Sequence, residues 1–229
     1  MDQATLRTQI SSFDAESMSR IDTVLALAAQ QKIPLGIEYA GPKLFERITI
    51  HVRDTNILSA MESIFPVADG FRILTDDGVP VVSSNEIEGS ISGLINMTIS
   101  QFSVSSKCSA QMAEAALRTQ LYQQLAPHAD HGYGGSISGG GLPLVGPFTL
   151  EQVTIRHALD RIVRDHGQAA WIAQVPPAVF ERPIDSRDAQ EIMSGRRIVW
   201  TIVEYDSPLA HRISQITQEH TLRQEHTLR

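Results

Sequence analysis

The chain has 229 residues, of which 42% are hydrophobic and 20% charged, as is typical of a protein with a packed core. Its formal net charge of −7 argues against a dedicated nucleic-acid binder, which needs clustered Lys and Arg to displace counterions from phosphates. The single cysteine, Cys108, excludes an intrachain disulfide, and no segment approaches the roughly 18 consecutive apolar residues of a membrane span.

The first half of the chain predicts the element order β-α-β-β-α-β-β. Alternation around Phe13 indicates a first strand, and the residues after Ser19, a candidate N-cap, have the apolar spacing of a helix that Pro34 ends. The other predicted elements are strands at 35–39, 48–52, 71–74 and 79–82 and a helix at 56–65. Asp76-Asp77-Gly78 is a typical turn between the last two strands. This order predicts helices packed on one face of a small mixed sheet.

The second half restates this order after a polar linker. Ser109 is a candidate N-cap for its first helix, and Gly167 ends the second. The predicted elements are strands at 94–104, 148–150, 169–175 and 198–203 and helices at 109–125 and 155–165. The long departure is a glycine-rich insertion at residues 126–147, and long loops in compact domains are often functional or disordered.

One stretch occurs in both halves. Residues 48–65 read ITIHVRDTNILSAMESIF and residues 146–163 read GPFTLEQVTIRHALDRIV. A shift of 98 positions (155 − 57) makes their helical apolar residues coincide, Ile57, Ala60, Met61 and Ile64 with Ile155, Ala158, Leu159 and Ile162. Each copy predicts a strand that leads into an amphipathic helix, so the pattern indicates an internal duplication.

We therefore predict an α+β fold of two tandem β-α-β-β-α-β-type units, with helices packed on small mixed sheets that either pack separately or join. The first unit covers residues 8–83, a linker covers 84–93, and the second unit covers 94–206 with its insertion at 126–147. Residues 207–229 end in a tandem QEHTLR repeat and are expected to be a disordered or helical tail outside the fold.

Residues 12–82 combine several apolar motifs. They are a leading Phe13-Asp14 strand, a helical run at 24–29, a Gly-Ile-Glu-Tyr strand at 36–39, an Ile-Thr-Ile-His-Val strand at 48–52, an Ala-Met-Glu helix at 60–62 and a closing hairpin. In this combination the first half resembles the secretin and TonB short N-terminal domain, the STN or N0-type module. Residues 94–175 look like a more divergent copy of it.

The resemblance implies a non-catalytic module at the periplasmic end of outer-membrane channels, in contact with an envelope or secretion component. No barrel or channel sequence follows and the insertion is foreign to the short module, so we expect only an adaptor-like role to carry over. The implied compartment is the periplasm, yet the opening MDQATLRTQISSF lacks the apolar core of an export signal. The residues alone therefore leave open a cytoplasmic protein or a mature or trimmed form.

The insertion holds the best metal-ligand candidates, His128, Asp130 and His131. Two imidazoles and a carboxylate could bind a first-row ion if a further ligand came from elsewhere. Proline precedes them and glycines follow, so nothing fixes them on a helix face, and a solvated loop is the expected structure. We therefore predict neither a metal nor a cofactor.

Three residues are candidates for contact with a protein partner: Trp200, His157 and Arg161. Trp200 would serve as an anchor if it faced outward on an open sheet edge, because Trp is enriched at interface hot spots. Core packing is the default expectation for its side chain. His157 and Arg161 are i, i+4 neighbours on the polar face of a helix and could meet a partner or water. An open sheet edge could itself accept a strand from another chain.

Other polar residues have structural explanations. Glu38 lies on an alternating strand and is expected to face solvent. Cys108 with His157 or His166 could form a thiol–imidazole pair, but the flanking residues lack a cysteine-protease signature, so an inert thiol is expected.

These observations predict a non-enzymatic protein–protein interaction module. The alternative is an enzyme, or a small-molecule or metal-binding protein, whose site lies under the 126–147 loop and forms a deep pocket with convergent polar groups. A weak homodimer through open strand edges and an orphan structural domain are further alternatives that the residues leave open.

Overall fold

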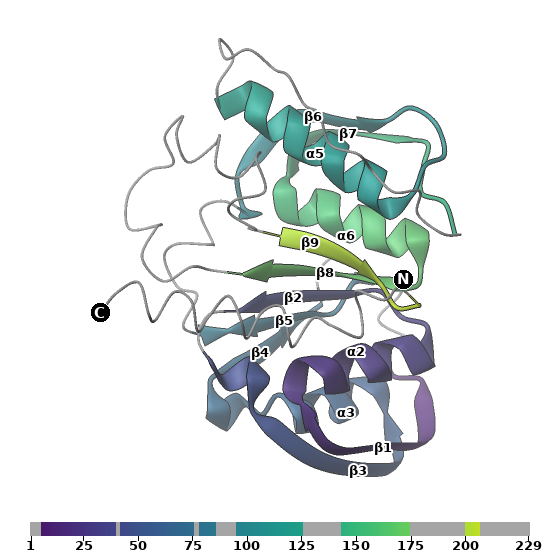
Figure 1. The fold of residues 1–229 in the computed structure, drawn as a ribbon, viewed down its shortest axis with the longest axis vertical. Helices are drawn as coiled ribbons and strands as arrows, with labels where there is room; N and C mark the ends of the chain where they lie inside the picture. Colours follow the sequence, from purple (N-terminus) through teal and green to yellow (C-terminus); the bar gives the residue numbers. More distant parts are fainter. Residues whose placement is uncertain are drawn as a thin grey trace.

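A five-stranded mixed sheet forms the centre of the computed structural model, which describes residues 6–39, 42–75, 78–85, 95–125, 143–174 and 200–206 (Figure 1). The strand order is β4 (Phe71–Leu74), β5 (Val81–Ser84), β2 (Leu35–Tyr39), β8 (Ala169–Gln174) and β9 (Trp200–Glu204). β2 runs parallel to both β5 and β8, whereas β4 is antiparallel to β5 and β9 is antiparallel to β8. The β2–β8 pair therefore joins the two halves of the chain in one sheet.

The first half covers one face of this sheet with two further layers (Figure 1). Two helices, α2 (Arg20–Gln31) and α3 (Ile57–Ile64), lie between the central sheet and an antiparallel pair, β1 (Gln9–Ser19) and β3 (Arg47–Asn56). Short 3-10 turns, η1 (Pro42–Phe45) and η2 (Val67–Asp69), precede β3 and β4. The observed order β1-α2-β2-β3-α3-β4-β5 is the order that the sequence predicted.

The second half covers the opposite face in the same manner (Figure 1). Its helices are α5 (Ala110–Leu125) and α6 (Ile155–His166), and its outer antiparallel pair is β6 (Thr98–Val104) and β7 (Phe148–Thr154). Each pair of helices thus packs between two sheets, which the prediction of helices on one face of a single sheet did not include.

Alternation along the strands of the central sheet divides the apolar core into two clusters. In β8, Trp171 and Ala173 belong to the cluster of the second half, and Ala170 and Ile172 belong to that of the first half. Successive side chains of a strand point to opposite faces, so a strand between two helical layers is apolar on both sides. Trp171, the largest of these side chains, is fully buried.

Local signals in the sequence place the helix ends. Ser19 Oγ accepts a hydrogen bond from the amide of Asp22 at 3.1 Å, and Ser109 Oγ accepts one from the amide of Met112 at 3.3 Å. These contacts confirm both predicted N-caps. Gly167 ends α6 with φ of +79°, a left-handed conformation that favours glycine.

The stretches that coincide after the 98-position shift also share backbone geometry. Phe13 pairs with Val52, and Phe102 pairs with Leu150, which follows Val52 by that same shift. The next matched pair, Asp54 and Gln152, both have positive φ, +46° and +49°. The helix caps match as well: Asn56 accepts from the amide of Ser59 at 2.9 Å, and Thr154 accepts from that of His157 at 3.2 Å. The same strand-to-helix step is therefore built twice.

The α+β class predicted from the sequence is confirmed. Within the described ranges, no helix is long and apolar enough to cross a membrane. Most of the linker at 84–93, most of the insertion at 126–147 and the tail at 207–229 lie outside the described residues.

Candidate functional site

The predicted site residues fall in different places. His128, Asp130 and His131 lie outside the described residues. Within the part of the chain that the structure describes, no group of three or more His, Cys, Asp or Glu side chains is arranged to hold a metal ion.

Trp200 does not meet the condition set for a partner-binding anchor. Its side chain is 1% exposed and packs in the core cluster of the second half, with the Arg118 guanidinium 5.6 Å from the ring centroid. The default expectation of core packing is therefore confirmed, because β9 turns this side chain toward α5 rather than toward solvent.

His157 and Arg161 both lie on α6 and are half-buried. The Arg161 guanidinium lies 4.8 Å from the ring centroid of Phe148 and 3.9 Å from the Asp165 carboxylate. These contacts hold Arg161 against its own half of the protein.

Glu38 is buried, which corrects the expectation that it faces solvent. Its side chain is 2% exposed and forms an ion pair with Arg156, at the start of α6. Burial raises the pKa of the Glu38 carboxyl, and the nearby charge of Arg156 opposes that shift. The strand is enclosed on both faces, so this carboxylate needs a cationic partner from the other half of the chain.

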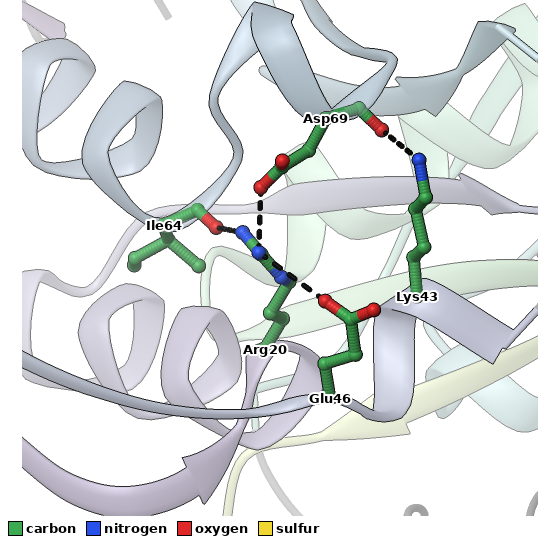
Figure 2. Close-up of polar contacts among 5 residues, drawn as sticks. All are labelled: Arg20, Lys43, Glu46, Ile64 and Asp69. Carbon is green, nitrogen blue, oxygen red and sulfur yellow. Dashed lines mark hydrogen bonds and ion pairs between the residues drawn. The ribbon is translucent and has the colours of Figure 1, made fainter.

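A second buried charge, Arg20, connects several segments of the first half (Figure 2). Its Nη2 donates to Asp69 Oδ2 at 2.6 Å and lies 3.4 Å from Glu46 Oε2, and its Nη1 donates to the carbonyl of Ile64 at 2.5 Å. Lys43 Nζ donates to the carbonyl of Asp69 at 2.9 Å. The guanidinium also lies 5.7 Å from the ring centroid of Phe71.

The formal charges of the Arg20 cluster balance, and both terminal nitrogens of the Arg20 guanidinium have acceptors, so the cluster is suited to stabilising the fold rather than to binding an anion. Arg20 meets the two carboxylates of Glu46 and Asp69, and the second cation, Lys43, binds the backbone carbonyl of Asp69 (Figure 2). The Ile64 carbonyl belongs to the last turn of α3, where a cation complements the helix dipole. The cluster thereby fixes the start of α2, the end of α3 and the η2 turn to one another.

We predict that Arg20→Met lowers the unfolding free energy by about 2 kcal/mol, measured by urea unfolding. The loss stays below that of a fully buried ion pair because the side chains of Asp69 and Glu46 are 39% and 54% exposed. Arg53→Met is the matched control, because Arg53 pairs with Asp14 at 2.8 Å while its side chain is 54% exposed. An unchanged urea midpoint for Arg20→Met would contradict the stabilising role of the Arg20 cluster.

The edge of the central sheet at β9 is closed by side chains of α5. The Glu114 carboxylate accepts a hydrogen bond from the amide of Ile202 at 3.1 Å, and Arg118 donates to the carbonyl of Trp200. Glu114 and Arg118 also form an ion pair. Both backbone groups point away from β8, so these two side chains satisfy two of the hydrogen bonds that a further strand would otherwise make.

The opposite edge, at β4, pairs on one side only within the described residues, and we call it the open edge. The amide of Asn85 donates to the carbonyl of Gly70 at 2.7 Å, in register with the β4–β5 pairing. Hydrogen-bonded and non-hydrogen-bonded pairs alternate in an antiparallel ladder, so the backbone groups of Arg72 face β5 and those of Phe71 and Ile73 face outward. Among the described residues, no strand pairs with this outer side.

Apolar side chains reach the surface in β4 and in the turn that precedes it. Val67, in the η2 turn that contacts β4, is 75% exposed, the highest value among the exposed large hydrophobic residues of the described chain. Ile73 itself is half-buried at the margin of the first core cluster. A strand added to β4 would therefore gain both backbone hydrogen bonds and apolar contacts.

Cys108 and His166 form one of the thiol–imidazole pairs considered from the sequence, and both are partly or fully buried. Burial raises the pKa of the Cys108 thiol, whereas a nucleophilic cysteine needs a lowered one. Desolvation lowers the pKa of His166, whose Nε2 lies 3.7 Å from the Glu204 carboxylate. The amide of Gln168 donates to His166 Nδ1 at 3.3 Å, so this ring contributes to the packing of the α6–β8 connection.

No protein family, curated protein or solved structure matched the chain in the comparisons. The sequence did not reveal the buried ion pair of Glu38 with Arg156 or that of Glu114 with Arg118. Of these, only the i, i+4 spacing of Glu114 and Arg118 could have indicated a pair, because Glu38 finds its partner in the other half of the chain.

Proposed function

We propose that this protein is a non-enzymatic interaction module that accepts an extended segment of a protein partner at the outer side of β4. The observation that carries the proposal is the difference between the two edges of the central sheet. Side chains of α5 satisfy two outward backbone groups of β9, the carbonyl of Trp200 and the amide of Ile202, while the outward groups of β4 meet no strand among the described residues.

Two further observations support an interaction role. The buried charged side chains described above each have a structural partner, as with Arg20, Glu38 and Glu114, and none converges with others on an exposed reaction centre. The resemblance of the first half to the secretin and TonB short N-terminal domain favours the same class of function. It also favours an envelope or secretion component as the partner.

The test is site-specific photocrosslinking in the cells that make the protein. A photoreactive residue replaces Arg72, which is exposed on β4, and a second sample carries it at Glu62, which is exposed on α3. We expect a discrete crosslinked product from position 72 that is lost when Ile73→Pro is added, because proline removes the outward amide. Equal crosslinking at positions 72 and 62, or a product that Ile73→Pro leaves intact, would overturn the proposal.

A matched proline substitution checks the orientation of the strand. Ile73→Pro removes an amide that faces outward, and edge positions of this kind tolerate proline. Arg72→Pro removes an amide that faces β5, so we expect a clearly lower melting temperature for Arg72→Pro than for Ile73→Pro. The reverse order would mean that the outward groups of β4 have been misassigned.

A further inference from the structure

The side chains of the central sheet form rows that end at the open edge. Register across the five strands places Trp200, Ala173, Glu38, Ser83 and Arg72 side by side. The next row, on the opposite face, contains Thr201, Ile172, Ile37, Val82 and Ile73. Any strand that pairs with β4 adds one residue to each row.

Within the described residues, the row that ends at Arg72 has a positive charge at the edge that no ion pair compensates. Glu38 is already ion-paired with Arg156, and Arg72 acts on Glu38 only through longer-range attraction. Arg72 is exposed and forms no ion pair with another described residue. Two guanidinium groups therefore share one carboxylate, which favours an acidic residue in the next position of this row.

The row that ends at Ile73 is apolar rather than charged. Ile172, Ile37 and Val82 are buried, and Ile73 is half-buried at the margin of the sheet. An apolar residue in the next position would cover Ile73 and extend the core of the first half. A β-branched residue suits this position because it packs well on a pleated surface.

We propose that the occupant of the β4 edge is an extended peptide segment with an acidic residue opposite Arg72 and, next to it, a β-branched apolar residue opposite Ile73. This inference rests on the proposed function and adds the chemistry of the partner. The segment extends the five-stranded sheet by one strand, and its backbone pairs with the outward groups of Phe71 and Ile73.

Arg72→Glu provides a charge-reversal test. The probes are two capped, fluorescently labelled peptides of alternating Thr and Val, identical except for one central residue, Glu in the first and Lys in the second. We expect the wild-type protein to bind the Glu peptide about fivefold more tightly than the Lys peptide at low salt, in line with the energy of one exposed cross-strand charge pair. Arg72→Glu should reverse this order, and Ile73→Pro should abolish binding of both peptides.

Lys107→Glu is the matched control, because Lys107 is exposed in the connection before α5 and its replacement changes the net charge by the same amount. It should leave the preference of the wild-type protein unchanged. Melting temperatures of all variants establish that they are folded. If Ile73→Pro does not fold, the reversed preference of Arg72→Glu still decides the test.

The alternative outcomes distinguish a failure of the acidic–apolar peptide assignment from a failure of the interaction module itself. Absence of peptide binding, together with crosslinking at position 72 that Ile73→Pro removes, would overturn the acidic–apolar assignment and leave the interaction module standing. An equal preference in the wild-type protein and in Arg72→Glu would overturn it as well. A dimer in sedimentation velocity that Ile73→Pro dissociates would identify a second copy of the chain as the occupant and likewise overturn it.

Discussion

Replacing Glu114 with alanine is expected to lower the unfolding free energy by about 3–5 kcal/mol, because it removes one partner of a buried ion pair. The Glu114 and Arg118 side chains are 9% and 16% exposed, so Arg118 would retain a desolvated charge without its carboxylate. The amide of Ile202, on β9, would lose its acceptor as well. Chemical denaturation measures this loss.

The same substitution has a second expected consequence, because it opens the β9 edge. With Glu114 removed, both edges of the central sheet present unpaired backbone groups, and edges of this kind promote association between chains. We expect concentration-dependent self-association of Glu114→Ala in sedimentation velocity at protein concentrations where the wild-type chain shows less. Glu62→Ala, which removes an exposed carboxylate from α3, serves as the control and should change neither property.

Glu114→Gln tests the charge separately from the hydrogen bond. Its amide oxygen can still accept from Ile202, so the stability loss should be smaller than for alanine. Burial raises the pKa of Glu114 above its usual value of 4.5, so the folded state binds this proton more tightly than the unfolded state. The wild-type protein should therefore lose stability relative to Glu114→Gln as the pH rises from about 4.5 through the raised pKa. A difference that does not depend on pH would contradict the assignment.

Local patterns predicted most of the elements but not their assembly. The caps at Ser19 and Ser109 and the helical faces of α3 and α6 depend on residues within a few positions of one another, and all were correct. The pairing of β2 with β8 depends on contacts between distant segments, and no periodicity within either strand encodes it. The shared central sheet was therefore beyond local analysis.

Glu38 shows how this limit produced a specific error. An apolar–polar alternation indicates a strand with one solvated face, and the sequence of β2 fits that pattern. Once β2 becomes the central strand, its polar face lies against α6, and Arg156 neutralises the carboxylate there. For Trp200 the default expectation of core packing is correct, since α5 covers its side chain.

Gly36 is the position on β2 where this central placement makes the strictest demand on side-chain size. A Cβ atom at Gly36 would lie 2.5 Å and 2.6 Å from Cζ2 and Cε2 of Trp171 and 2.9 Å from Cγ2 of Val81. Trp171 is fully buried, and its Nε1 donates to Asp160 Oδ1 at 2.7 Å, so the indole cannot move away without losing that bond. We therefore expect Gly36→Ala to cost about 3 kcal/mol, at the upper end of typical overpacking.

A double-mutant cycle with Trp171→Phe distinguishes this steric conflict from a general effect of alanine in the strand. Phenylalanine lacks the part of the indole that Gly36→Ala would touch, so the double variant should be more stable than the two single losses predict, by about 1–2 kcal/mol. Gly70→Ala provides the backbone control, because nothing lies within 4 Å of its added Cβ while its φ is +86°. We expect it to cost about 1 kcal/mol from conformation alone.

Additive losses in the cycle would show that Gly36 is not set by the indole of Trp171. Recovery in the double variant would instead show that the two halves of the chain are fitted to each other across the β2–β8 pair. Under that fit, the size of the residue at position 36 and the size of the residue at position 171 constrain each other, although the two positions come from different halves. Calorimetric melting of the four proteins, with one cooperative transition retained in each, decides between these outcomes.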